Sequence, residues 1–434
     1  MNTVLDVRAA ATRELLEALF RAAVGAAHPA NCLPPNLPEP PPRGRLVILA
    51  AGKAAGSMTQ VAEERYAGLP ATRLAGLAVT RHGYGRPTRR IPVIEAGHPV
   101  PDKAGVSATK RVLALADAVD GDDLVLVLLS GGASANWIAP AAGLTLEEKQ
   151  AATRALLKSG ATIGEMNTVR KHLSRIKGGR LAQRAYPAKV VTLAISDVPG
   201  DDPAVIGSGP TVPDPTTLAD ARQIVRRHRL DLPAAVTHAL NDGANETPKP
   251  GDKAFATSDY RMVARPADAL RTAAERATAA GYECVMLSDR LQGEAREVAA
   301  EHARLALSLS TEHRRAIILS GGEVTVTLRG HGRGGPNQEY ALALAIYLDG
   351  APGIAALAAD TDGTDGGSGR PDDPAGAFIG PTTLERARAT GLDPAAFLAD
   401  NNSTGFFNGI GDLFRPGPTF TNVTDFRAIV VDRL

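Results

Sequence analysis

The chain alternates between short apolar runs and stretches with helical periodicity. Four continuous apolar runs are typical of parallel strands buried on both faces, at residues 45–51, 74–80, 124–129 and 189–196. Helical patterns begin at about Lys53 and cover residues 103–119 and 145–185, with breaks near Gly160 and Gly178. This order of elements predicts an α/β domain.

The same alternation resumes after a polar break. Residues 241–252 are rich in polar residues, Gly and Pro and predict a domain boundary. Beyond it, strands are expected at 255–258, 283–287 and 316–319, with helices at 262–280 and 294–309. We therefore expect two α/β domains, at residues 1–245 and 246–434.

The N-terminal region has a different pattern. Residues 4–27 are predicted to form an amphipathic helix, because Leu15, Leu16, Leu19 and Phe20 lie on or near one stripe. Seven prolines lie between Pro29 and Pro42, which predicts an extended linker.

Composition narrows the class of protein. The chain has 434 residues and is therefore too long for one ordinary hydrophobic core. Its residues are 44% hydrophobic and 22% charged, which is typical of a globular protein. A net charge of +1 gives no support for binding to nucleic acid or membrane. Two cysteines, no signal-peptide pattern and no long apolar run lead us to expect a cytoplasmic protein. A homodimer is only the base-rate expectation.

Small residues and a lysine follow two of the predicted parallel strands. Gly52-Lys53 comes directly after residues 45–51, and Ser130-Gly131-Gly132-Ala133-Ser134 follows residues 124–129. Ligands of open α/β sheets bind beyond the carboxyl ends of the strands. Gly52, Ser130, Gly131 and Gly132 are therefore candidate phosphate-binding residues, and Lys53 is a candidate for transition-state stabilisation. The alternatives are a solvated helix start and a tight turn.

Three further segments with candidate site residues follow in the chain. Arg170 and Lys171 share one face of a predicted helix, which is either solvated or a clamp for a carboxylate or phosphate. Asp197 follows the strand at 189–196 and is a candidate general base or metal ligand. The irregular segment around Ser208 and Gly209 is a candidate anion nest, although such segments are also common turns.

A glycine-rich stretch occupies residues 330–339, and its backbone amides could surround a polyanion. Gly332, Gly334, Gly335 and Asn337 are accordingly candidate nucleotide-binding residues. The stretch also matches G-x-G-x-x-G, but residues 324–329 alternate apolar and polar positions. That alternation indicates a half-exposed, antiparallel strand, whereas a dinucleotide-binding fold requires a buried parallel one.

An acidic stretch follows the strand predicted at residues 354–358. Asp360, Asp362 and Asp365 are three carboxylates within six residues, the composition of a site for a hard cation. Their spacing does not match an EF-hand, and the alternative is an acidic turn. With the glycine-rich stretch, they predict a magnesium-nucleotide site.

Taken in order, these stretches resemble the type-2 glycerate kinase family, also called the MOFRL family after its C-terminal module. The resemblance covers nearly the whole chain and is carried by residues 51–54, 95–102, 129–134, 166–172, 196–198, 207–211 and 360–366. It implies an α/β enzyme with two domains. The N-terminal domain would be Rossmann-like, a sandwich with a parallel sheet between helices, and the C-terminal domain would contain a mixed sheet. The active site would lie in the cleft between them.

The resemblance also implies an activity. Members transfer the γ-phosphoryl group of ATP to D-glycerate and give 2-phosphoglycerate, with ATP and Mg²⁺ as the expected cofactors. Lys53 matches a lysine thought to be essential in the family. Members usually read G-G-R-N in the glycine-rich loop, and Pro336 stands here in place of that arginine. Either Arg333 substitutes for it or the acceptor differs from glycerate.

Chemistry and position complete the set of hypotheses. Phosphoryl transfer depends on positioning and charge neutralisation, so Lys53 and Arg333 are assigned to the transferred group. Ser134, Arg170 and Lys171 are assigned to the acceptor.

Three rival functions stay open. Relatives are often labelled hydroxypyruvate reductase, an NAD(P)-dependent activity for which G-x-G-x-x-G is the only motif support here. A kinase of another small hydroxy acid is the second, and a relative that binds nucleotide without turnover is a third.

Overall fold

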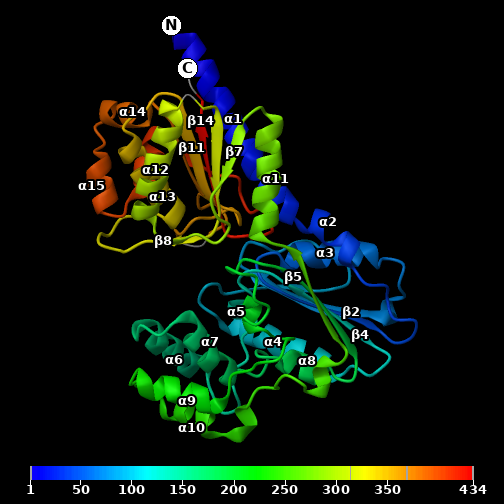
Figure 1. Cartoon of the computed structure of the whole chain (residues 1–434). Helices are drawn as coiled ribbons and strands as arrows, with labels where there is room; N and C mark the ends of the chain where they lie inside the picture. Colours follow the sequence, from blue (N-terminus) through cyan, green and yellow to red (C-terminus); the bar gives the residue numbers. More distant parts are fainter. Residues whose placement is uncertain (1, 313, 368–369, 433–434) are drawn as a thin grey trace. The chain divides into compact units, whose positions relative to one another are not determined.

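The chain forms two compact units in a computed structural model that describes residues 2–312, 314–367 and 370–432 (Figure 1). The inserted unit is residues 32–263, and the terminal unit joins residues 1–31 to residues 264–434. No helix among the described residues is long and apolar enough to cross a membrane.

These limits differ from the boundary expected at 245/246. Strand β6 (Ser258–Ala264) forms the edge of the sheet of the inserted unit, next to β5 (Lys189–Ile195), and therefore carries the boundary to about residue 263. At the other end, helix α1 (Asn2–Ala27) packs on α11 (Pro266–Ala279) and belongs to the terminal unit. The expected extended linker also begins with short helical segments, α2 (Pro29–Cys32) and η1 (Pro34–Asn36).

The inserted unit is built on a six-stranded sheet with the order β3-β2-β1-β4-β5-β6. Its other strands are β1 (Leu46–Ala51), β2 (Leu74–Arg81), β3 (Val93–Ala96) and β4 (Leu124–Leu129). All residues of β1 and β4 are buried, and the two strands pair in parallel from Leu46↔Leu124 to Ala51↔Leu129. The parallel α/β domain predicted from the apolar runs is confirmed.

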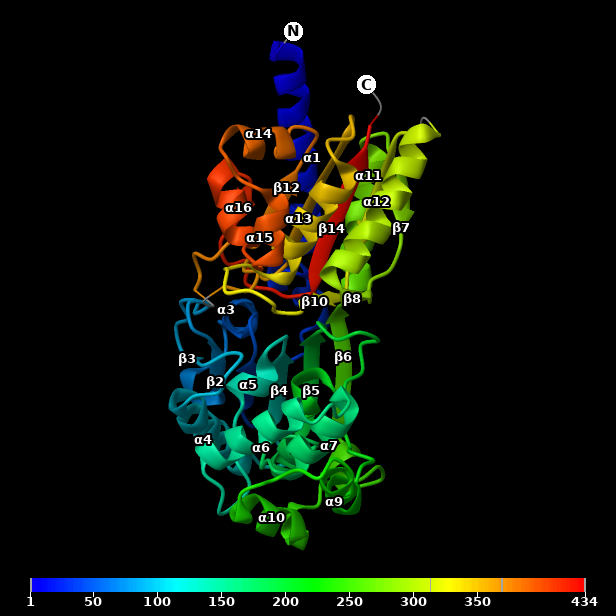
Figure 2. The ribbon, with the colours of Figure 1, turned by 90° about the vertical axis from the view of Figure 1, so that its left-hand side faces the viewer.

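Helices cover both faces of this sheet (Figures 1 and 2). Helix α3 (Ala55–Arg65) lies on one face, and α4 (Lys103–Asp117), α5 (Ala133–Asn136) and α8 (Arg180–Ala185) lie on the other. A separate apolar cluster joins four more helices, α6 (Leu146–Lys158), α7 (Ile163–His172), α9 (Leu218–Arg227) and α10 (Ala234–Asn241).

The terminal unit contains a mixed six-stranded sheet with the order β13-β12-β11-β14-β9-β7. The strands are β7 (Glu283–Met286), β9 (Ala316–Ser320), β11 (Ile354–Asp360), β12 (Gly376–Ile379), β13 (Leu413–Phe414) and β14 (Asp425–Val431). Only β7 and β9 pair in parallel; the other pairs are antiparallel. Both the mixed sheet and the two α/β folds that the family resemblance implies are confirmed.

This second sheet also lies between helices. Helices α12 (Ala295–Thr311) and α13 (Pro336–Leu348) cover one face, and α1 and α11 cover the other, as both views show (Figures 1 and 2). Helices α14 (Thr383–Ala389), α15 (Pro394–Ala399) and α16 (Ser403–Ile410) complete the unit. Alternate strand residues serve the two faces, so that Ile429 and Val431 join the α12–α13 cluster.

A buried histidine links α12 to α13. Nδ1 of His302 lies 2.7 Å from the hydroxyl of Tyr340, and His302 is only 4% exposed. Burial, together with the positive charge of Arg427, lowers the pKa of His302 from 6.5 to about 4. The imidazole is therefore neutral in the folded protein at pH values where it is protonated in the unfolded chain.

This histidine predicts a loss of stability in acid. Between pH 6.5 and 4 the unfolded chain binds a proton at His302 that the folded protein does not, so stability falls as the pH falls. The expected contribution is about 3 kcal/mol. Urea unfolding at a series of pH values should show that the free energy of unfolding falls less steeply below pH 6.5 in His302→Gln than in the wild type. His238→Gln, on an exposed part of α10, is the control, and an unchanged acid limb in His302→Gln would contradict the assignment.

Candidate active site

The order of the first sheet reverses between β1 and β4. Successive strands run outward from β1 to β3 on one side and from β4 to β6 on the other. In open α/β sheets such a switch point opens a crevice at the carboxyl ends of the strands, where ligands bind. Lys53 and Ser130 follow these two strand ends, so the structure brings them to the predicted position.

The loops after β1 and β4 are in direct contact. The Lys53 N–H donates to the Gly131 carbonyl at 2.7 Å, and the Ala54 N–H donates to the Ser130 hydroxyl at 2.9 Å. Gly52 has φ +115°, and a Cβ atom there would lie 2.4 Å from the Ser130 carbonyl oxygen. Gly52 is thus required for close packing of the two loops.

Gly132 has a comparable constraint. Its φ is +84°, and a Cβ atom would lie 2.9 Å from the His98 ring and 3.4 Å from Cγ of Lys53. The side chains of Lys53 and His98 therefore border the diglycine. The N–H groups of Gly131 and Gly132 donate to no other residue that the structure describes, which leaves them for oxygen atoms of a ligand.

A second cluster lies where α5 begins. The Ser134 hydroxyl is 2.8 Å from the Ser208 hydroxyl, and Nζ of Lys177 donates to the Ser134 carbonyl and hydroxyl at 2.6 and 2.5 Å. Ser208 has φ +64°, and its carbonyl accepts a hydrogen bond from the Gly178 N–H. Ser134, expected at the acceptor, and Ser208, expected at the nucleotide, are therefore neighbours although they lie far apart in the sequence. Gly209 packs on Ala204.

The two basic residues of α7 differ in their surroundings. Lys171 is 6% exposed, and its Nζ lies 3.5 Å from Oδ1 of Asp214, so its charge is compensated inside the protein. Arg170 is half-buried, its side chain bonds to no described residue, and burial lowers its pKa. The expectation that Lys171 contacts the acceptor is therefore not supported, whereas Arg170 stays a candidate.

Asp197 lies two residues beyond the end of β5, next to β4 in the sheet. Its carboxylate is half-buried. Asp197 therefore stands at the same sheet edge as Lys53 and Ser130, as the sequence predicts for a base at a strand end.

The glycine-rich loop of the terminal unit is folded differently from the prediction. The N–H groups of Arg329 and Gly330 donate to Oδ1 of Asn401, and the Gly332 N–H donates to the carbonyl of Asp400. Several of the amides expected to surround a polyanion are therefore used inside the protein. Cβ atoms at Gly332 and Gly334 would collide with residues 402 and 403, so these glycines serve close packing.

The residues before this loop also differ from the predicted strand. Only β10 (Glu323–Thr325) forms, and it pairs in parallel with β8 (Gln292–Glu294) instead of antiparallel. Gly335 precedes α13, and Pro336 is the first residue of that helix, where its missing N–H costs nothing.

Asn337 and Asp365 form a buried cap at the start of α13. Asp365 accepts the backbone N–H groups of Asn337 and Gln338 at 3.0 and 2.9 Å and also both side-chain amides. The Asn337 amide further donates to Asp425 at 2.6 Å. Burial raises the pKa of Asp365 to about 7. Because Asn337 is fully buried, the expected nucleotide contact is not supported, and Asp365 instead stabilises the helix start.

The acidic stretch does not converge on one cation. Among residues 2–312, 314–367 and 370–432 no group of three or more His, Cys, Asp or Glu side chains could hold a metal ion. Asp360 accepts the N–H of Asp362 at 2.9 Å, and Asp362 accepts the N–H and hydroxyl of Thr364. The predicted three-carboxylate site is therefore absent from this part of the chain. Asp360 and Asp362 stay candidates, because Mg²⁺ needs only one or two carboxylates besides phosphate oxygens.

Arg333 projects from the glycine-rich loop. Its side chain is 69% exposed and lies 3.6 Å from the carboxylate of Asp373. A guanidinium that is mostly in contact with solvent and held by one ion pair can move to another anion at little cost.

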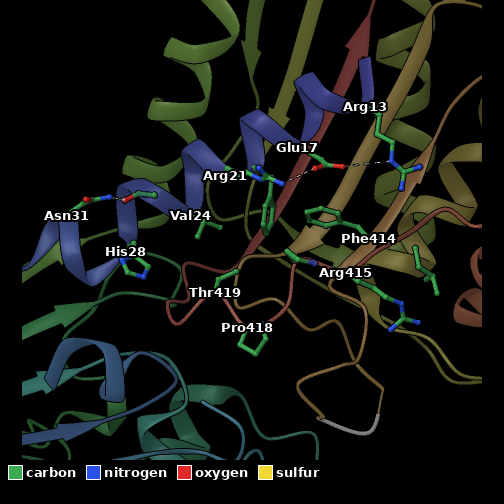
Figure 3. Close-up of a pocket in the computed structure, with 14 residues that line it drawn as sticks. Arg13, Glu17, Arg21, Val24, His28, Asn31, Phe414, Arg415, Pro418 and Thr419 are labelled. Atoms are coloured by element: carbon green, nitrogen blue, oxygen red, sulfur yellow. Dashed lines mark hydrogen bonds and ion pairs between the residues drawn. The ribbon is translucent and has the colours of Figure 1, made fainter. Parts of the chain in front are cut away.

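A cavity of about 630 Å³ in the terminal unit contains none of the predicted site residues (Figure 3). It lies between α1 and residues 413–419 and is lined by Arg13, Arg21 and Arg415, among others. Arg13 and Arg21 pair with Glu17, and Arg415 donates to the Asp372 carbonyl, so these charges already have partners. We place the candidate site at the carboxyl ends of β1, β4 and β5 in the inserted unit instead.

Neither Lys177 nor His98 is among the site residues predicted from the sequence. Lys177 only follows the basic helical face proposed as a clamp, and His98 lies within residues 95–102. Their positions beside Ser134 and Gly132 depend on contacts between segments distant in sequence.

Comparison with known proteins gives matches over most of the chain. Residues 15–241 match a family model described as a domain of unknown function, DUF4147, and residues 316–425 match the MOFRL family. The D-glycerate 2-kinase of Thermotoga maritima is 39% identical over 88% of this chain and 89% of its own length. A putative hydroxypyruvate reductase of Agrobacterium vitis is 49% identical over 96% of this chain and 94% of its own length.

Solved structures agree with these matches. The crystal structure of a glycerate kinase from Thermotoga maritima superposes with a TM-score of 0.85 at 37% identity and covers 97% of this chain and 99% of that one. Likeness of this extent in both sequence and fold shows that the chain belongs to the glycerate 2-kinase family, whose C-terminal part is the MOFRL module.

Proposed function

We propose that the protein is a glycerate 2-kinase, which transfers the γ-phosphoryl group of ATP to D-glycerate and gives 2-phospho-D-glycerate and ADP. The observation that carries this proposal is Lys53, which stands at the switch point of the first sheet beside the unoccupied N–H groups of Gly131 and Gly132. A cation and two amide donors at such an edge suit a phosphate chain. A relative with 39% identity is named D-glycerate 2-kinase.

Each proposed role follows from charge and position. Lys53 and Arg333 offset the negative charge that develops on the transferred group. Asp197 accepts the proton of the attacking hydroxyl. Arg170 and Ser134 contact the acceptor.

Asp360 and Asp362 are the residues that would hold a magnesium ion. Asp360 is half-buried at the end of β11 and Asp362 follows two residues later, and carboxylate oxygens are the ligands that Mg²⁺ prefers. A bound Mg²⁺ would neutralise charge on the phosphate oxygens of ATP. Asp365 is excluded from this role because its carboxylate caps α13.

The test is a coupled assay for ADP release with MgATP and D-glycerate. A parallel assay with enolase and pyruvate kinase reports 2-phosphoglycerate directly, since enolase acts on the 2-phosphate. ADP release that depends on D-glycerate and feeds enolase supports the proposal. ADP release with other small hydroxy acids, but not with glycerate, would assign a different acceptor.

Hydroxypyruvate reductase is the second candidate, because two relatives at 49% and 50% identity are named putative hydroxypyruvate reductase. The turn after β1 reads Gly52-Lys53-Ala54-Ala55-Gly56, which lacks the dinucleotide fingerprint. The match at residues 330–335 follows only the three-residue strand β10. Oxidation of NADPH by hydroxypyruvate in the same preparation would favour the reductase.

A further inference from the structure

Three cationic side chains gather inside the inserted unit. Lys149 of α6 is 5% exposed, Lys177 in the turn before α8 is 3% exposed, and Arg170 of α7 is half-buried. Burial lowers the pKa of Lys177, and the positive charges of Lys149 and Arg170 lower it further. None of them forms an ion pair with a residue that the structure describes.

Lys149 has a structural explanation. Its Nζ donates to the carbonyl of Leu173 at 2.6 Å and to that of Arg170 at 3.4 Å, so it holds the carbonyl end of α7. Burial and the charge of Arg170 lower the pKa of Lys149 to about 7. Both hydrogen-bond partners of Lys149 belong to the end of α7, so no ligand is needed to account for this lysine.

Lys177 and Arg170 have no such explanation. Lys177 donates only to Ser134, which in turn meets the Ser208 hydroxyl, and the Arg170 side chain has no partner among the described residues. Burial lowers the pKa of both groups. Burial disfavours the charged form of each group, and an anion bound beside them would favour that form again.

The position of this cluster specifies which anion it suits. Ser134 follows Gly132 by two residues, so the cluster lies directly beyond the diglycine that we assign to phosphate. An acceptor whose hydroxyl attacks a phosphoryl group at Lys53 would extend its other end toward Ser134.

We infer that Lys177 and Arg170, with the hydroxyls of Ser134 and Ser208, form an anion pocket that takes the carboxylate of the acceptor, and that Lys177 selects acids over uncharged polyols. This inference rests on the proposed kinase function for the identity of the ligand. Lys177 is a specificity-determining residue that the sequence analysis did not include.

The experiment compares Lys177→Met and Arg170→Met with the wild-type protein. KM is measured for D-glycerate and for MgATP, and turnover is measured with D-glyceramide, the uncharged analogue. Each variant should raise KM for D-glycerate about 30-fold or more, since loss of a buried charge partner costs at least about 2 kcal/mol. KM for MgATP should not change, and the preference for glycerate over glyceramide should disappear. Arg154→Met, on the exposed face of α6, is the matched control.

Two results would overturn the inference while the kinase stands. One is an unchanged KM for D-glycerate in both variants; the other is a raised KM for MgATP alone, which would assign the pocket to nucleotide phosphate. If Lys177→Met does not fold, Arg170→Met decides, because that side chain has no described partner to lose.

Failure of the kinase proposal gives a different result. If the wild type releases no ADP with D-glycerate, thermal protection by D-glycerate is measured in the wild type and both variants. Protection that is lost in the variants supports the anion pocket without the kinase activity. Equal protection in all three proteins, or none in the wild type, overturns the pocket as well.

Discussion

Alanine at Lys53 is expected to lower kcat by about a thousandfold while the protein stays folded. A single cationic or hydrogen-bond donor aimed at charge in the transition state contributes about 3 to 4 kcal/mol. Lys53 is half-buried at the mouth of the turn after β1, and the backbone contacts of that turn do not involve its side chain. The effect should appear in kcat, measured by ADP release, more than in the urea midpoint.

Lys103→Ala is the matched control for this substitution. Lys103 is also a lysine at the start of a helix of the inserted unit, but it is exposed on α4. Its loss should leave kcat unchanged. Near-normal turnover in Lys53→Ala would contradict the assignment of phosphoryl transfer to the switch point, even if the protein were a kinase.

Alanine at Arg333 is expected to lower kcat about a hundredfold. The proposal gives this guanidinium the function of the arginine that the family usually has at the position of Pro336, and charge stabilisation by one donor is of this order. Folding should be nearly unaffected, because the Arg333 side chain is 69% exposed and Asp373 keeps the hydrogen bond from the Arg370 N–H. KM for D-glycerate should change less than kcat.

The control is Arg329→Ala, an exposed arginine at the start of the same loop. If Arg329→Ala and Arg333→Ala behave alike, the loop contributes only general positive charge. If Arg333→Ala keeps wild-type kcat, the arginine missing at Pro336 has no substitute at Arg333. If Arg333→Ala does lose activity, the double variant Arg333→Ala, Pro336→Arg tests whether an arginine at the usual position restores kcat.

Local apolar patterns predicted much of the fold. The run at 124–129 coincides with β4 because every residue of it is buried on both faces of a parallel sheet. Strand β14 was not predicted, since a fully buried Arg427 interrupts its apolar run. That arginine is tolerated because it pairs with Asp425 and donates to the Gly321 carbonyl, contacts that sequence patterns do not reveal.

The candidate site was predicted unevenly for the same reason. Residues at strand ends, such as Lys53 and Asp197, were placed well because parallel topology brings such ends to one edge. The glycine-rich loop was misinterpreted, since its amides bond to Asp400 and Asn401 about seventy residues away. Composition indicates which groups are present, but only the fold determines whether they already have partners.

The attachment of α1 to the terminal unit affects how the chain is made. Phe20 of α1 packs edge-to-face on Phe414 and Phe426, and its side chain is 1% exposed. During synthesis α1 leaves the ribosome before these partners exist, whereas residues 32–263 form a continuous segment that can fold as soon as it emerges. The apolar face of α1 therefore stays without its native partners until the whole inserted unit has been synthesised. An expression fragment of residues 264–434 alone would expose the aromatic surface that α1 covers.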